Sequence, residues 1–121
     1  MEYTSFENIQ SKVTPGVSYT IAKMSFGRRV ELTRRIRELA ARKEFVEAGD
    51  TVDEKMDAAL LASEIERIYL LWGLKEVTGL ELDGLPATAE SLVASGPEEL
   101  FREAVAVVKQ QCGLSEAERK N

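Results

Sequence analysis

The chain has 121 residues, a formal net charge of −5, a single cysteine and no histidine. This length suits one domain with a core of its own, and the lack of histidine excludes Ser-His-Asp and Cys-His catalysis as well as imidazole zinc sites. An intrachain disulfide is excluded too, and we expect Cys112 to be a buried apolar side chain rather than a reactive thiol.

The charge is distributed unevenly along the chain. Residues 28–43 carry a net charge of +5, whereas residues 44–121 carry −10. An acidic majority repels phosphate, which disfavours nonspecific binding to DNA and to anionic membranes. The N-terminus lacks the pattern of a signal peptide and the longest apolar runs are too short to span a bilayer, so we expect neither a leader nor a membrane span.

The first 24 residues predict a β-hairpin. Apolar and polar residues alternate over 9–13 and again over 17–21, as expected for two half-buried strands. Between them, Pro15 fixes φ at the first corner of a turn and Gly16 supplies positive φ at the second, as a type II turn requires. An isolated hairpin is marginal in water, so this one is expected to pack on the rest of the chain.

A long amphipathic helix is predicted over 26–48. Ser25 is a suitable N-cap, and Gly49 ends the pattern. At 100° per residue, the apolar side chains of this segment fall on one face. That face consists of Leu32, Ile36, Leu39, Ala40 and Val46.

The same helix is rich in arginine. The stretch FGRRVELTRRIRELAARK at 26–43 carries seven basic and two acidic residues, and Arg28, Arg35 and Arg42 recur every seven positions beside the apolar face. Three interpretations remain open: a solvated face with intrahelical ion pairs, which is the commonest case, a protein-binding surface, or a nucleic-acid-binding helix. An acidic connector and an apolar helix follow, rather than a recognition helix, which disfavours the third.

A second helix is predicted over 52–78. Thr51 and Glu54 have the spacing of a capping box at its start. Beyond its first two turns the apolar residues, which include Leu61 and Trp72, point nearly all round the axis. Such a helix is either surrounded by the chain's own core or has an extra face that meets a partner.

Shorter elements complete the chain. A strand and a tight turn are predicted over 80–86, and Thr88 is expected to cap a short helix that continues to about residue 94. Ser95 is expected to cap a last helix that runs to Gly113, with Pro97 in its first turn. The remaining residues, 114–121, are too few for a stable helix, and we expect a frayed tail.

These elements predict a mainly α, single-domain fold over 1–121. It consists of a β-hairpin at 1–24, a helical core at 25–113 with a short β element near 80–86, and the tail. Acid pairs such as Asp57/Glu64 and Glu99/Glu103 share helix faces, and we interpret them as solvated faces. Without histidine or a phosphate-binding glycine loop, we expect no enzyme, no cofactor and no metal.

Five segments that together cover most of the chain carry a family resemblance. They are PGVSYTIAKMSFGRRVELTRRIREL at 15–39, YLLWGL at 69–74, GLELDG at 79–84, GPEEL at 96–100 and GLSEAERKN at 113–121. Their order resembles that of the tail assembly chaperones of long-tailed bacteriophages and prophages. None of the segments is a mechanistic signature, so the resemblance is one of overall pattern.

The resemblance implies a function. Such chaperones are small, acidic, mostly helical proteins of the bacterial cytoplasm that bind the hydrophobic, helix-rich tape measure protein. They keep it soluble until tail tube subunits polymerise around it, and they are absent from the mature virion. In many phages a ribosomal frameshift yields an extended form that recruits the tail tube protein.

For this chain we expect the tape measure protein to bind along the two long helices. The expected partner-binding residues are Arg28, Arg35, Arg42, Leu32, Ile36, Leu39, Leu61 and Trp72. The arginines would pair with acidic residues beside a covered apolar seam. A homo-oligomer is also expected, because an over-apolar helix invites self-association. The competing classes are a DNA-associated regulator that uses the helix at 26–43 and a structural tail component.

Overall fold

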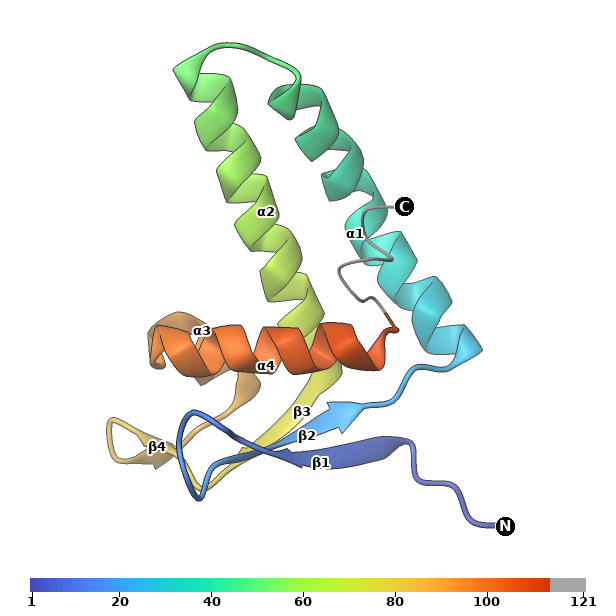
Figure 1. The fold of residues 1–121 in the computed structure, drawn as a ribbon, viewed down its shortest axis with the longest axis vertical. Coiled ribbons are helices and arrows are strands. Elements are labelled where there is room, and N and C mark those ends of the chain that lie inside the picture. Colours follow the sequence, from blue (N-terminus) through green and yellow to red (C-terminus); the bar gives the residue numbers. More distant parts are fainter. Residues whose placement is uncertain (114–121) are drawn as a thin grey trace.

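The computed structural model describes residues 1–113. The elements, in chain order, are β1 (Phe6–Gln10), β2 (Ser18–Ala22), α1 (Phe26–Glu47), α2 (Val52–Gly73), β3 (Leu74–Thr78), β4 (Glu81–Leu82), β5 (Leu85–Pro86), α3 (Ala89–Ser95) and α4 (Glu98–Gln111). A base of strands with α3 and α4 carries a hairpin of two long helices, α1 and α2, which projects from it (Figure 1). The predicted mainly helical fold is confirmed. The expected frayed tail at 114–121 lies outside the described residues.

An antiparallel sheet in the order β1-β2-β3 forms the floor of the base. The predicted hairpin is present, because β1 pairs with β2 through a turn in which the N–H of Val17 donates to the carbonyl of Thr14 at 3.3 Å. Gly16 has a φ of +88°, which fits the second corner of the predicted turn. Tyr19 and Ile21 of the central strand are fully buried beneath the helices.

The second helix is shorter than predicted. It ends at Gly73, and the segment Leu74–Thr78, expected to be helical, is strand β3. This segment pairs with β2, with Val77 opposite Tyr19, and Leu74 and Val77 are buried. The buried side chains of this segment therefore pack into the core from a strand. Its pairing with β2 decides its conformation and outweighs the helical spacing of its apolar residues. The predicted two-stranded hairpin is therefore part of a three-stranded sheet.

The last helix, α4, lies across the inner face of the sheet and contacts both β2 and α2. Its buried side chains are Leu100, Ala104, Val105 and Val108. The predicted cap at Ser95 is wrong, because α4 begins at Glu98 with Pro97 in the N-cap position and no side-chain cap. Ser95 instead ends α3, where its hydroxyl donates to the carbonyl of Ser91 at 3.3 Å.

The projecting hairpin has the predicted caps. The Ser25 hydroxyl accepts from the N–H of Arg28 at 3.2 Å, and Thr51 and Glu54 form the capping box that starts α2. Helix α1 packs along α2 and has few contacts with the sheet. Only the lower half of α2 is covered by α3 and α4, which leaves the upper part of the hairpin open to solvent (Figure 1).

Candidate functional site

Within residues 1–113 no group of three or more His, Cys, Asp or Glu side chains is placed to hold a metal ion. In the same part of the chain, every helix is too short or too polar to cross a bilayer. The exposed apolar side chains of α2 form a candidate binding surface.

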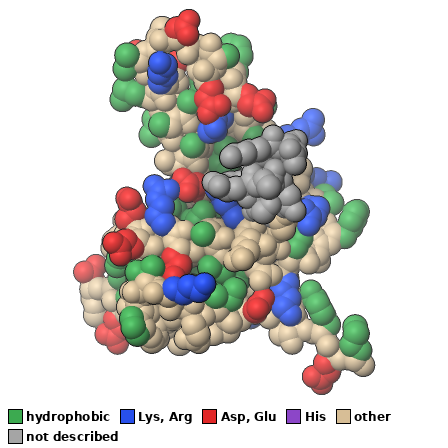
Figure 2. Space-filling model, in the orientation of Figure 1, with side chains coloured by type: hydrophobic (Ala, Val, Ile, Leu, Met, Phe, Trp, Pro, Cys, Tyr) green, Lys and Arg blue, Asp and Glu red, His purple; other side chains and the backbone are tan. Residues whose placement is uncertain are grey.

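Helix α2 has a second apolar face that points away from α1. Val52, Met56 and Leu60 recur every four residues, which places them on one side of the helix. Their exposed fractions are 73%, 60% and 65%. We call these three residues the outer stripe. Hydrophobic side chains along the outer edge of the projecting hairpin are visible in Figure 2.

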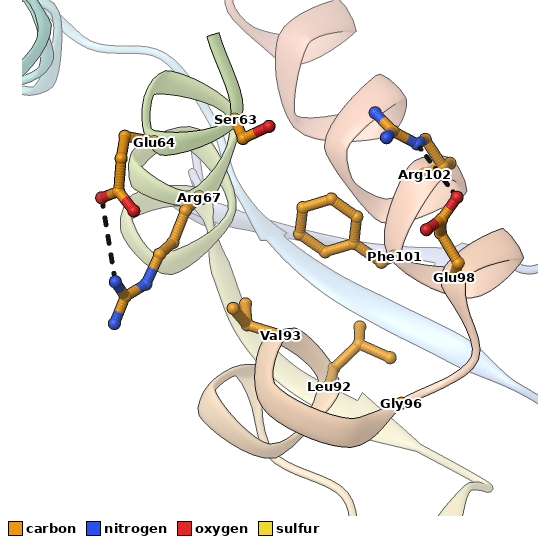
Figure 3. A pocket seen from close by; sticks show the side chains of 9 residues that line it. All are labelled: Ser63, Glu64, Arg67, Leu92, Val93, Gly96, Glu98, Phe101 and Arg102. Carbon is orange, nitrogen blue, oxygen red and sulfur yellow. Dashed lines mark ion pairs between the residues drawn. The ribbon is translucent and has the colours of Figure 1, made fainter. Parts of the chain in front are cut away.

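The outer stripe leads down to a hollow of about 300 Å³ between α2, α3 and α4. We call it the elbow hollow. Its lining consists of Ser63, Glu64 and Arg67 from α2, Leu92, Val93 and Gly96 from α3 and its end, and Glu98, Phe101 and Arg102 from α4. Figure 3 shows Phe101 and Val93 at the centre of this space, with charged side chains at its edges.

Ion pairs line the rim of the elbow hollow. Arg102 joins α4 to α2, because its Nη1 lies 2.9 and 3.0 Å from the two carboxylate oxygens of Glu66. Glu98 lies on the other side of Arg102 at 3.9 Å, and Arg67 and Glu64 form a looser pair on α2 at 3.8 Å. Exposed pairs of this kind stabilise a fold only slightly. Their effect here is to place charges of both signs around an apolar floor.

The five apolar residues expected to bind a partner lie within the chain's own packing. Leu32 is 4% exposed and belongs to the hydrophobic core. Ile36 and Trp72 are half-buried and pack against that core, and Leu39 and Leu61 are half-buried as well. The physical reason is that α1 has one apolar face, and it is used to hold α2. The structure thus places the open apolar surface on the outer stripe instead.

The three arginines expected to form one edge are in different environments. Arg28 is part of the fold: its Nη1 donates to the carbonyls of Ser5 at 2.9 Å and Lys23 at 3.0 Å, and its guanidinium lies 4.8 Å from the centre of the Phe6 ring. Arg35 pairs with Glu31 at 2.7 Å within α1, as the solvated-face interpretation predicts. Arg42 is exposed and forms no ion pair with another residue of 1–113.

The sequence interpretation of Glu103 as part of a solvated face is wrong. Its carboxylate accepts from the hydroxyls of Ser11 at 2.5 Å and Tyr19 at 2.7 Å, and from the N–H groups of Lys12 at 2.8 Å and Val13 at 3.2 Å. It thereby joins α4 to the turn of the β-hairpin. No local pattern signals this role, because Ser11 lies 92 positions away in the chain.

Because of these contacts, the stability of the fold depends on whether the Glu103 carboxylate is ionised. Burial by itself raises this pKa, but the hydrogen bonds from Ser11, Tyr19, Lys12 and Val13 outweigh it and hold the pKa below its ordinary value of 4.5. The stabilisation is therefore present above the unfolded-state pKa and is lost as the pH falls through the lower folded-state pKa.

We predict a pH-dependent difference between the wild type and Glu103→Gln. The gap between their free energies of unfolding should be largest near neutral pH and should shrink as the pH falls below the ordinary value of 4.5. Urea denaturation of both proteins at several pH values measures this gap. A gap that is constant from neutral to acid pH would show that the ionised carboxylate is not responsible.

Cys112 is buried, as predicted from its place in the apolar pattern of the last helix. Burial raises the pKa of its thiol, and the positive charge of Arg29 offsets this only in part. A raised pKa lowers the fraction of reactive thiolate at neutral pH.

A search of protein-family models, curated proteins and solved structures found no match to this chain. The described residues form a small, mainly helical domain in which α2 carries an open apolar face. The surface consists of the outer stripe and the elbow hollow, both on the side of α2 away from α1. Its function is inferred from that surface and from the resemblance described above.

Proposed function

We propose that this protein is a non-enzymatic tail assembly chaperone of a long-tailed phage or prophage. It binds apolar helical segments of the tape measure protein and keeps them soluble during assembly of the tail tube. The observation that supports this most is the exposure of Val52, Met56 and Leu60 on a helix that leads into an apolar hollow. Contiguous exposed apolar side chains mark interaction sites.

The proposed binding mode is a helix laid lengthwise on the outer stripe. Such recognition reads apolar residues at helical spacing on the partner. Met56 suits it, because an unbranched thioether adapts to different partner side chains. Each of the three side chains offers about 1 to 3 kcal/mol on full burial, and the ordering of both partners cancels much of this. Binding of one segment is thus expected to be weak, which allows release when the tube assembles.

The competing function is a DNA-associated regulator that would use the Arg-rich helix at 26–43. Within that helix, Arg28 is engaged by the backbone carbonyls of Ser5 and Lys23, and Arg35 forms an exposed ion pair with Glu31. A gel-shift titration at two salt concentrations would reveal strong, salt-dependent binding of DNA if the regulator interpretation were right.

As part of the proposal, the protein acts in the host cytoplasm, is absent from the mature virion, and meets the tail tube protein through an extended form.

The proposal predicts that a charge in the outer stripe strongly lowers chaperone activity. Leu60→Lys should lower the yield of soluble tape measure protein on co-expression about tenfold, because a lysine at the centre of the contact must be desolvated. Soluble tape measure protein in the cleared lysate is the measurement.

The matched control for this test is Leu85→Lys. Leu85 is 70% exposed, like Leu60, but it lies on β5 rather than on the projecting helix α2. This variant should support the wild-type yield. Equal yields with Leu60→Lys and the wild type would refute the proposed role of the surface.

A further inference from the structure

We infer that the helix bound on the outer stripe carries lysine or arginine along one edge, so that the site accepts cationic amphipathic helices and rejects anionic ones. The inference rests on the proposed function and adds the charge of the partner to it. It follows from the side chains that flank the outer stripe on α2.

One flank of the outer stripe is acidic. At 100° per residue, Asp53, Asp57 and Glu64 lie on the same side of Val52, Met56 and Leu60. Asp53 and Asp57 are exposed, and neither forms an ion pair within residues 1–113. Glu64 reaches Arg67 only at 3.8 Å, and both side chains are about half exposed. A helix dipole accounts for Asp53 in the first turn of α2 but not for Asp57, which lies beyond it.

The opposite flank differs. It carries Lys55 and Glu66, and the carboxylate of Glu66 is already held by both contacts to Arg102. Unpaired negative charge therefore borders only one side of the stripe. A bound helix with basic residues along the matching edge gains attraction there, and one with acidic residues along that edge is repelled.

A second copy of this chain is a poorer occupant of the same face. Two α2 helices that pack antiparallel about a two-fold axis bring identical flanks together, because such an interface is self-complementary. Asp53, Asp57 and Glu64 of one copy would then face the same acidic residues of the other. The charge of the flank thus favours a different chain, with basic residues, over antiparallel self-association through the outer stripe.

Two synthetic helical peptides test the inference with the full-length chain. Both have the same leucine and methionine stripe, and one has lysine and the other glutamate along a single edge. Fluorescence anisotropy should show that the lysine-edged peptide binds about tenfold tighter, with the difference shrinking at high salt. The double variant Asp53→Lys/Asp57→Lys should lose or reverse the preference.

The control is the double variant Glu76→Lys/Glu81→Lys. It makes the same change in net charge, but at exposed residues of the sheet region, in β3 and β4. It should keep the preference of the wild type. A control variant that loses the preference to the same extent would assign the effect to net charge and overturn the inference.

Other results of these binding experiments would also overturn the inference. Equal affinity for both peptides, or no binding of either, would overturn the inference. So would self-association that sedimentation velocity detects in the wild type and finds abolished in Leu60→Lys, because a second copy would then occupy the stripe. The proposed function fails by a different measurement, when Leu60→Lys supports as much soluble tape measure protein as the wild type.

Discussion

Replacing Glu103 with alanine is expected to lower the free energy of unfolding by about 2 to 4 kcal/mol, because four donors lose one shared acceptor. The hydroxyls of Ser11 and Tyr19 and the N–H groups of Lys12 and Val13 all donate to this carboxylate. Hydrogen bonds to an ionised acceptor are stronger than neutral ones. The carboxylate also joins the turn between β1 and β2 to α4, so its loss should loosen the base of the fold.

Tyr19 explains why this loss is larger than that of an ordinary surface contact. The residue is fully buried, and its hydroxyl donates to the carboxylate at 2.7 Å. Burial, and after it the hydrogen bond to Glu103, raises the pKa of Tyr19 well above its ordinary value of 10.0. Without the carboxylate, a buried hydroxyl lacks its acceptor.

Chemical denaturation of Glu103→Ala, Glu103→Gln and Glu38→Gln provides the measurement. Glutamine retains one acceptor oxygen, so Glu103→Gln should lose less stability than Glu103→Ala. Glu38 is exposed on α1 and has no hydrogen-bond or ion-pair partner among the described residues, so Glu38→Gln should stay within about 0.5 kcal/mol of the wild type. Three variants of equal stability would contradict the assigned role of Glu103.

The second large effect is expected at Gly79. This residue has a φ of +83°, and a Cβ placed there would lie 2.0 Å from the backbone carbonyl oxygen of Gly16 in the hairpin turn. Gly79→Ala should therefore combine backbone strain with displacement of that turn, at a cost of about 3 kcal/mol in the free energy of unfolding. Thermal or urea denaturation measures this cost.

Gly84 serves as the control that distinguishes backbone strain from the close approach to the hairpin turn. It has nearly the same φ, +81°, but a Cβ there meets nothing within 4 Å. Gly84→Ala should cost only the strain of a left-handed residue, about 1 kcal/mol. If the two alanine variants lost equal stability, the close approach between Gly79 and the hairpin turn would have no energetic role.

Much of the fold could be predicted from local chemistry. The capping box at Thr51 and Glu54, the cap at Ser25 and the turn with Gly16 at its second corner each depend on residues close in sequence, and each is present. The third strand could not be predicted in this way. Leu74–Thr78 has apolar residues at spacings that also suit a helix, and only its pairing with β2, more than 50 positions earlier in the chain, decides its conformation.

The sequence indicated that the second helix has more apolar residues than one face needs, but it did not indicate which of them stay exposed. Excess apolar residues on the second helix indicated either a surrounded helix or an extra face, and the structure leaves Val52, Met56 and Leu60 exposed while Leu61 and Trp72 are half-buried. Helical spacing cannot tell which of two apolar faces the chain covers with its own α1. The contacts of Arg28 could not be predicted from the arginine spacing either, since the carbonyls that hold it belong to the segment before β1 and the segment after β2.

The central claim is that the tape measure protein binds on the side of α2 that points away from α1. Site-specific photo-crosslinking tests it directly, with the photoreactive residue placed at position 56 in the outer stripe or at position 85 on β5, both exposed in the free chain. In cells that co-express the tape measure protein, we predict crosslinks from position 56 and none from position 85. Crosslinks from position 85 but not from position 56 would contradict the claim.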